Sequence, residues 1–242
     1  MTLTNTEQQS EQKKPMPKKL IGVVMGVLVI GGAGYWAVSS GLLNLGSFQT
    51  GVPSGALVAK VNGEGIEKRL FDARFGQAKS NYEVQGIALE AADAEQLRQE
   101  VLDDMINKTL LAQYGIEQGI GAPDQAVEDS YRQIVTQFES EQELQDQLAS
   151  QGITTEDVRS AISQELILEQ VAERQAADNN VQVSEEETRK VYDDAVAGGA
   201  EVPEFDGVKG EIEQYVRQQK IGQLLNALVE RLRKEGTIEI LS

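Results

Sequence analysis

The segment Leu20–Ser39 constrains this chain more than any other part of its sequence. It contains fourteen apolar side chains, five glycines and one serine, and it carries no charge. A helix of twenty residues rises about 30 Å, which matches the thickness of the hydrocarbon core of a bilayer. The segment therefore predicts a single transmembrane helix.

Basic residues indicate how this helix is oriented. Four lysines lie between positions 13 and 19, directly before the apolar segment, and the next basic residue is Lys60. Positively charged residues tend to remain on the cytoplasmic side of a membrane helix. We therefore expect residues 1–19 to form a cytoplasmic tail and the chain after Ser39 to be extracytoplasmic.

Two further interpretations of the apolar segment concern its processing and its self-association. The small residues Ala37 and Ser39 resemble a signal-peptide cleavage site, although the apolar stretch exceeds the roughly 7–15 residues usual for such signals. Cleavage would export the same downstream chain. Gly22 and Gly26 have the spacing that lets two membrane helices approach closely, which allows a homodimer through the anchor.

The composition excludes many classes of function. The chain has 22 Lys and Arg against 39 Asp and Glu, a net charge of −17, and neither His nor Cys. Triads with histidine, cysteine nucleophiles, zinc sites with imidazole or thiolate ligands and disulfides are therefore excluded. Nucleic acid is an unsuitable partner because its phosphates require a basic surface. We expect no cofactor, no metal and no catalytic residue, and we interpret the acidic pairs as solvated helix faces.

The rest of the sequence predicts a short tether followed by helices. Residues 40–56 are uncharged and rich in Gly and Ser, as flexible linkers are. Beyond them, apolar residues at helical spacing, together with start and stop signals, predict seven helices. The predicted helices cover residues 66–82, 93–118, 123–138, 140–152, 154–177, 184–196 and 205–234.

Local signals mark the ends of several predicted helices. Asp93 is the expected N-cap of the second helix, and Ser140-x-x-Glu143 and Ser184-x-x-Glu187 have the form of capping boxes. Gly119 and Gly152 are suited to the left-handed conformation that ends a helix.

Two short strands are predicted at the two ends of the helical region, at residues 57–62 and 237–241. A single strand is not stable by itself, so we expect these two to pair, with Val61 beside residues 238–241. The predicted fold class is mostly α, with a small two-stranded sheet that joins the first and last segments of one domain, residues 57–242.

Several segments of the sequence, taken together, resemble a known protein family. In order and spacing, the segments Val58–Phe75, Val101–Ile120, Phe138–Val171 and Val183–Asp194 resemble the N-terminal chaperone module of SurA-type folding factors. The segment Val208–Leu241 resembles the helix and strand that complete this module. With the N-terminal anchor, the layout is similar to the membrane-tethered, PpiD-like members of the class.

The resemblance implies a helical module on the extracytoplasmic side of a bacterial inner membrane. In this family the module binds unfolded or newly translocated polypeptides without ATP. A parvulin-type prolyl isomerase domain usually precedes the final helix in the relatives, but here only Ala195–Glu204 occupies that place, which is too short for a domain with a core. We therefore expect no isomerase activity and no other enzymatic activity.

Three aromatic residues near the ends of predicted helices are the candidate client-binding residues, namely Tyr82, Tyr131 and Phe138. A chaperone needs some uncovered apolar surface, and partial exposure is expected near helix ends. Burial in the core is the alternative for each of them. The alternative for the whole protein is an envelope scaffold that binds one specific partner through its helical domain.

Overall fold

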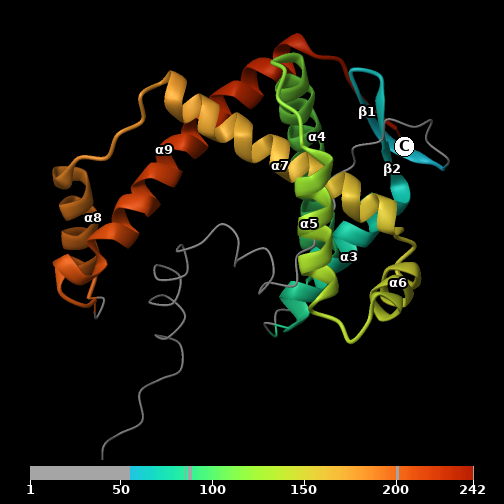
Figure 1. The fold of residues 1–242 in the computed structure, drawn as a ribbon, viewed down its shortest axis with the longest axis horizontal. Helices are drawn as coiled ribbons and strands as arrows, with labels where there is room; N and C mark the ends of the chain where they lie inside the picture. Colours follow the sequence, from blue (N-terminus) through green and yellow to red (C-terminus); the bar gives the residue numbers. More distant parts are fainter. Residues whose placement is uncertain (1–54, 85, 87–88, 200–201, 242) are drawn as a thin grey trace, which may run out of the picture. The chain divides into compact units, whose positions relative to one another are not determined.

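The computed structural model describes residues 55–84, 86, 89–199 and 202–241 (Figure 1). Within these residues the fold is mostly helical with a small antiparallel sheet, so the predicted fold class is confirmed. The predicted membrane helix Leu20–Ser39, the glycines Gly22 and Gly26 and nearly all of the predicted tether lie outside the described residues. Within the described part, no helix has both the length and the apolar character needed to cross a membrane.

The helices lie within three residues of their predicted bounds, because helical spacing and end signals are local properties of the sequence. They are α3 (Lys68–Val84), α4 (Ala91–Glu117), α5 (Asp124–Val135), α6 (Glu141–Ser150), α7 (Thr155–Asp178), α8 (Glu185–Ala197) and α9 (Phe205–Glu235).

The helix caps follow the sequence signals in most places. Ser184 and Glu187 form the predicted capping box of α8. At α6 only half of the predicted box forms: the Ser140 hydroxyl accepts from the backbone N–H of Glu143, whereas the Glu143 carboxylate accepts from the backbone N–H of Glu139 at 2.7 Å. The contacts that cap the N-terminus of α6 therefore begin at Glu139, one residue before the predicted capping box.

The predicted N-cap of α4 is wrong, whereas the two predicted glycine stops are confirmed. The helix begins at Ala91, two residues before Asp93, which lies in the first turn. Its carboxylate can stabilise the positive end of the helix dipole from there. Gly119 and Gly152 both have a positive φ, as expected of residues that end α4 and α6.

The sheet contains β1 (Leu57–Val61), β2 (Glu64–Glu67) and β3 (Ile238–Ile240), in the order β2-β1-β3. The expected pairing of the first and last segments is confirmed, since Val61 lies opposite Ile238 in an antiparallel register. The third strand, β2, was not predicted: Ile66 and Glu67 fall within the predicted helix 66–82, and Glu64 and Gly65 belong to no predicted element. Asn62 and Gly63 both adopt positive φ, which reverses the chain in two residues and folds β2 back onto β1.

The side chain of Asn62 ties the two ends of the described chain together. The backbone N–H of Asn62 donates to the carbonyl of Thr237, and the N–H of Thr237 donates to the Asn62 side-chain oxygen. Both hydrogen bonds are 2.8 Å long. The Asn62 amide also donates to Gln113 on α4 at 2.9 Å, and Gln113 donates to the carbonyl of Val61 at 3.0 Å. The β1–β2 turn is thus held both by the segment after α9 and by α4.

The larger part of the chain packs around three groups of buried apolar side chains. The first lies between the sheet, α3 and α4, and includes Ile66 and Met105. The second joins α5, α6 and α7 and includes Leu144 and Val158. The third lies between α4, α7 and the C-terminal half of α9 and includes Leu228. We call these the first, second and third clusters.

Glycine permits the close packing of α4 on α7. A Cβ atom at Gly115 would lie 2.6 Å from a methyl group of Ile167 and 2.9 Å from one of Val171. Real side chains do not approach so closely, so any larger residue at this position would push the two helices apart. The third cluster therefore depends on the absence of a side chain at this position.

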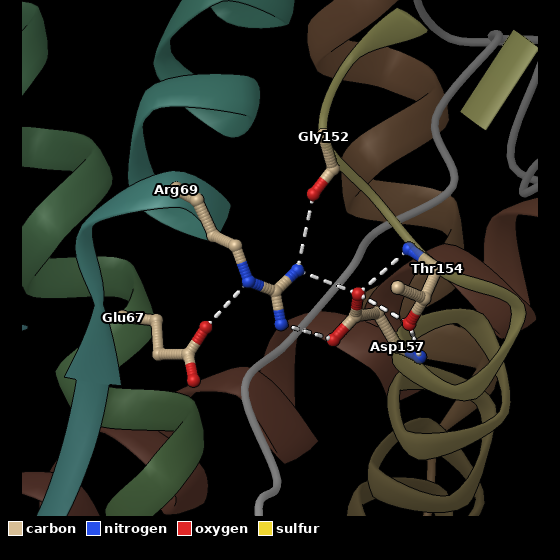
Figure 2. Close-up of polar contacts among 5 residues, drawn as sticks. All are labelled: Glu67, Arg69, Gly152, Thr154 and Asp157. Atoms are coloured by element: carbon tan, nitrogen blue, oxygen red, sulfur yellow. Dashed lines mark hydrogen bonds and ion pairs between the residues drawn. The ribbon is translucent and has the colours of Figure 1, made fainter. Parts of the chain in front are cut away.

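A partly buried ion-pair network joins the start of α3 to the start of α7 and the turn before it (Figure 2). Arg69 donates two hydrogen bonds to Asp157, at 2.6 and 2.7 Å, and one to the carbonyl of Gly152 at 3.2 Å. Its Nε lies 2.5 Å from the carboxylate of Glu67, which is fully buried. Asp157 also completes a capping box with Thr154 at the start of α7. One guanidinium thus connects the first cluster with the helices of the second.

The network shifts the pKa values of both of its central groups. Burial alone would raise the pKa of Asp157, but the hydrogen bonds from Arg69 and Thr154 outweigh this effect and hold the pKa below its usual value. The bidentate hydrogen bond to Asp157 raises the pKa of Arg69. Both groups therefore remain charged at neutral pH, and neither is poised to exchange a proton there.

The described residues form two compact units. The larger unit comprises the described residues of 55–183 and 215–241. The smaller unit comprises the described residues of 184–214. In the smaller unit, the Tyr192 hydroxyl donates to the carbonyl of Pro203 at 3.0 Å, and the Tyr192 and Phe205 rings meet edge to face. Arg189 lies over the ring of Phe205, so α8 and the first turns of α9 form a small hairpin with its own contacts.

Replacing Asn62 tests how much the turn contributes to stability. In Asn62→Gly we expect the free energy of unfolding to fall by about 1–2 kcal/mol, because the side-chain hydrogen bonds are lost while positive φ remains accessible. In Asn62→Ala a further loss of about 1 kcal/mol is expected from the strained φ. Urea unfolding measures both values. A glycine variant as stable as the natural protein would show that the side-chain bridge contributes nothing.

Replacing Asp157 tests the buried network. In Asp157→Asn the free energy of unfolding at pH 7 should fall by about 2 kcal/mol, because a charge-assisted hydrogen-bond pair is lost. The contribution of Asp157 is complete above its unfolded-state pKa of about 3.9 and is lost as the pH falls through its lower folded-state value. Urea unfolding should therefore show the two proteins converging below about pH 4.

The matched control for this experiment is Asp194→Asn, which breaks an exposed ion pair with Lys190. Exposed pairs contribute little to stability because water screens them, so this variant should remain close to the natural protein at every pH. A stability difference for Asp157→Asn that stays constant from pH 7 to pH 3 would contradict the assigned role.

Candidate functional site

Two of the three candidate client-binding residues are partly exposed, as expected. Tyr82 lies in the last turn of α3 and packs against the edge of the first cluster. Phe138 follows α5 and packs against the edge of the second cluster. Each ring therefore presents part of its surface to solvent while the remainder is fixed by the core. A client-binding role for these residues remains a prediction.

The expected partial exposure of Tyr131 is wrong. Its ring is only 3% exposed and lies within the second cluster. Helices α6 and α7 cover it, and this long-range packing is not visible in the local sequence around α5. The Tyr131 hydroxyl donates to Glu141 at 3.1 Å, so the polar end of the side chain is also occupied. A ring covered in this way cannot contact a client in this conformation.

A cation lies directly over the Tyr131 ring. The guanidinium carbon of Arg159 is 3.9 Å from the ring centroid, and its Nε lies 2.6 Å from the carboxylate of Glu128. The hydrogen bond with Glu128 raises the pKa of Arg159, and the same bond lowers the pKa of Glu128. Burial and the hydrogen bond to Glu141 raise the pKa of Tyr131. Both effects favour the neutral form of the tyrosine.

A second charged group lies between α3 and α4. Arg74 contacts Asp104 at 2.7 Å, and Lys108 lies 3.7 Å from the same carboxylate. Burial and the nearby Arg74 lower the pKa of Lys108, and Asp104 opposes this effect. Glu165 on α7 also acts on both cations. Arg74 on α3 pairs with Asp104 on α4, so this contact joins the two helices, whereas the Lys108–Asp104 pair lies within α4.

The described residues contain no arrangement of acidic side chains that could hold a metal ion. The buried carboxylates of the Arg69 network are engaged with the guanidinium and with the cap of α7. These contacts join the start of α3 to the start of α7.

The structure divides the three candidates between two places. Tyr131 and Phe138 both belong to the second cluster, whereas Tyr82 belongs to the edge of the first. They therefore do not form one continuous site of three rings.

Among the residues that the structure describes, four large apolar side chains are exposed and were not predicted as candidates. They are Val84 at 84%, Ile240 at 70%, Val196 at 47% and Ile116 at 46% exposure. Helical or alternating spacing identifies the side of an element that faces the core, but it does not show where along the element the core ends. Val84 and Ile240 each lie at the end of their element, beyond the cover of the first cluster.

Comparison with known proteins gives low but consistent similarity to folding factors. The chain is 27% identical over 137 residues to the chaperone SurA of Saccharophagus degradans, covering 56% of this chain and 31% of that protein. It is 32% identical over 132 residues to the chaperone SurA of Chromobacterium violaceum, covering 54% and 30%. It is 25% identical over 150 residues to the foldase protein PrsA of Clostridium botulinum, covering 57% and 44%.

The chain thus spans less than half the length of each of these relatives. A family model gives a broader match: the model of the SurA-like N-terminal domain matches residues 9–172. This match begins before the apolar segment Leu20–Ser39 and ends within α7. Because it covers more than half of the sequence, the chain belongs to the family of the SurA-like N-terminal domain.

Proposed function

We propose that this protein is a chaperone of the holdase type, which binds unfolded or newly exported polypeptides without ATP. Membership of the SurA-like N-terminal domain family carries the proposal. The relatives named above are a chaperone and a foldase, and the chain corresponds to less than half of each. We therefore assign to this chain only the binding of unfolded clients, and not every activity of those longer proteins.

The surface chemistry supports this proposal. Tyr82 and Phe138 are partly exposed, and Val84 and Ile240 are strongly exposed. Burial of apolar surface is non-directional, so exposed side chains of this kind can contact an extended chain without a fixed sequence. The net charge of −17 keeps such a protein soluble and favours clients with basic segments.

The proposed chaperone has no prolyl isomerase activity and is not an enzyme. Relatives of the resembled type carry a parvulin domain before the final helix, and here Ala195–Glu204 takes that place. The whole sequence contains neither His nor Cys, which such active sites use. Binding would therefore delay aggregation and leave the isomer state of client prolines unchanged.

The proposed location is the bacterial inner membrane, with the N-terminus inside and residues 57–242 on the extracytoplasmic side. The apolar segment Leu20–Ser39 and the lysines before it support this location. Residues 40–56 would act as a short tether that keeps the helical domain at high local concentration near emerging clients. Gly22 and Gly26 allow the anchor to pair with a second copy.

The holdase proposal is tested with the full chain in neutral lipid nanodiscs. At equimolar amounts and without ATP, we expect it to slow the aggregation of several unrelated unfolded proteins, measured by light scattering. Empty nanodiscs are the control. If no unfolded protein is protected while one partner is captured at fixed stoichiometry from an envelope extract, the protein is an envelope scaffold and the proposal is wrong.

The contribution of the partly exposed rings is tested by the double variant Tyr82→Ser, Phe138→Ser. We expect it to protect clients several-fold less well, because two apolar contacts are lost while the helices remain folded by circular dichroism. Val196→Ser removes an exposed apolar side chain from the smaller unit and is the matched control. Equal losses in both proteins would show that the two rings have no special part in binding.

A further inference from the structure

The two outer strands of the sheet, β2 and β3, differ in how far their residues are buried. Three of the four residues of β2 are buried, and the strand leads directly into α3. In contrast, β3 is partly or fully exposed along its whole length, and Ile240 is 70% exposed. Within the described residues, the edge at β3 is therefore the open edge of the sheet.

The register shows which backbone groups of β3 face this open edge. Asn62 donates to the carbonyl of Thr237, and the N–H of Leu241 donates to the carbonyl of Val58. Lys60 lies opposite Glu239, midway between these two pairs. In an antiparallel pair, hydrogen-bonded and non-hydrogen-bonded positions alternate.

It follows that Glu239 faces β1, whereas the N–H and C=O groups of Ile238 and Ile240 point away from it. No hydrogen bond from the described part of the chain reaches these outward groups. They form a short row of two donors and two acceptors, which is a template for another extended strand.

The side chains along the edge are apolar on the side that faces the core. Ile240 lies opposite Ala59, which in turn lies opposite Ile66 on β2. Ala59 and Ile66 are fully buried, so this row of side chains begins in the first cluster and ends, exposed, at Ile240. A side chain on an added strand could extend the row by one position.

We propose that an extended segment of an unfolded polypeptide adds to the open edge of β3 as a fourth strand. This inference rests on the proposed function and names the contact by which a client is held. Backbone hydrogen bonds would supply affinity without a required sequence, and an apolar client residue beside Ile240 would supply the remaining contact. Such binding suits a protein that must accept many unrelated clients.

Charge favours a client polypeptide over a second copy of this chain as the strand that adds to β3. The symmetric pairing that uses all residues of β3 in both copies is centred on Glu239. It would place two Glu239 side chains directly opposite each other, which is unfavourable. The net charge of −17 adds to this repulsion. A client with alternating apolar and basic residues instead places Lys or Arg opposite Glu239.

The test uses a fluorescent nine-residue peptide of alternating Val and Lys, with blocked ends, and the full chain in neutral lipid nanodiscs. We expect Ile240→Pro to weaken binding at least tenfold, measured by fluorescence anisotropy. Proline removes the outward N–H, and its ring is tolerated on an edge strand. The matched control is Ile240→Val, which keeps the N–H and a branched apolar side chain and should bind normally.

A second peptide separates hydrogen bonding from charge. The same sequence methylated on alternate backbone nitrogens keeps every charge and side chain but loses the donors of one edge. We expect this peptide to bind at least tenfold more weakly to the natural protein. Equal binding of the two peptides would show that general attraction to the acidic surface is responsible, and strand addition would be wrong.

Further outcomes separate this inference from the proposed function. If the natural protein protects clients from aggregation and Ile240→Pro protects and binds peptide equally well, strand addition is wrong and the holdase proposal stands. If the natural protein protects no client, the proposed function itself fails. A dimer seen by sedimentation that Ile240→Pro abolishes would assign the edge to a second copy and overturn the inference.

Discussion

The larger unit depends on the pairing of its first and last strands. The backbone contacts between Asn62 and Thr237 join positions 175 residues apart, and the register of β1 with β3 fixes the end of α9 against the sheet. Strands so far apart in sequence pair slowly, because the long segment between them must first close into a loop, and the pairing needs further contacts to stabilise it. The positive-φ turn and its side-chain bridge to α4 provide these contacts. The same closure leaves β3 as an edge, because no further strand follows it within the described residues.

Specific contacts between the helices add to the apolar packing of the three clusters. Arg69 connects the start of α3 with the cap of α7, and Gly115 lets α4 and α7 approach closely. Arg69 pairs with both Glu67 and Asp157, so these two buried carboxylates help to hold the elements of the larger unit together. A protein built in this way can interact with a partner through exposed apolar side chains and open backbone, which agrees with a proposed role in holding unfolded chains.

Much of the fold was predictable because its signals are local. Spacing and caps placed the helices, and the marginal stability of lone strands predicted that the first and last would pair. The strand β2 was missed because its four residues lead into α3 without a break in the apolar pattern. The burial of Tyr131 depends on α6 and α7, and the partners Arg69 and Asp157 lie 88 residues apart. The exposure of Ile240 depends on where the core ends. No local pattern encodes these last three features.

We propose that a folded helical module holds unstructured chains through uncovered apolar side chains and an open strand edge. Amide hydrogen exchange of the full chain, with and without a bound unfolded client, tests this proposal. We expect the outward amides of Ile238 and Ile240 to exchange rapidly in the free protein and to become protected, together with amides near Tyr82 and Phe138, when the client is bound. A client that is held while these amides exchange as rapidly as before would contradict the claim.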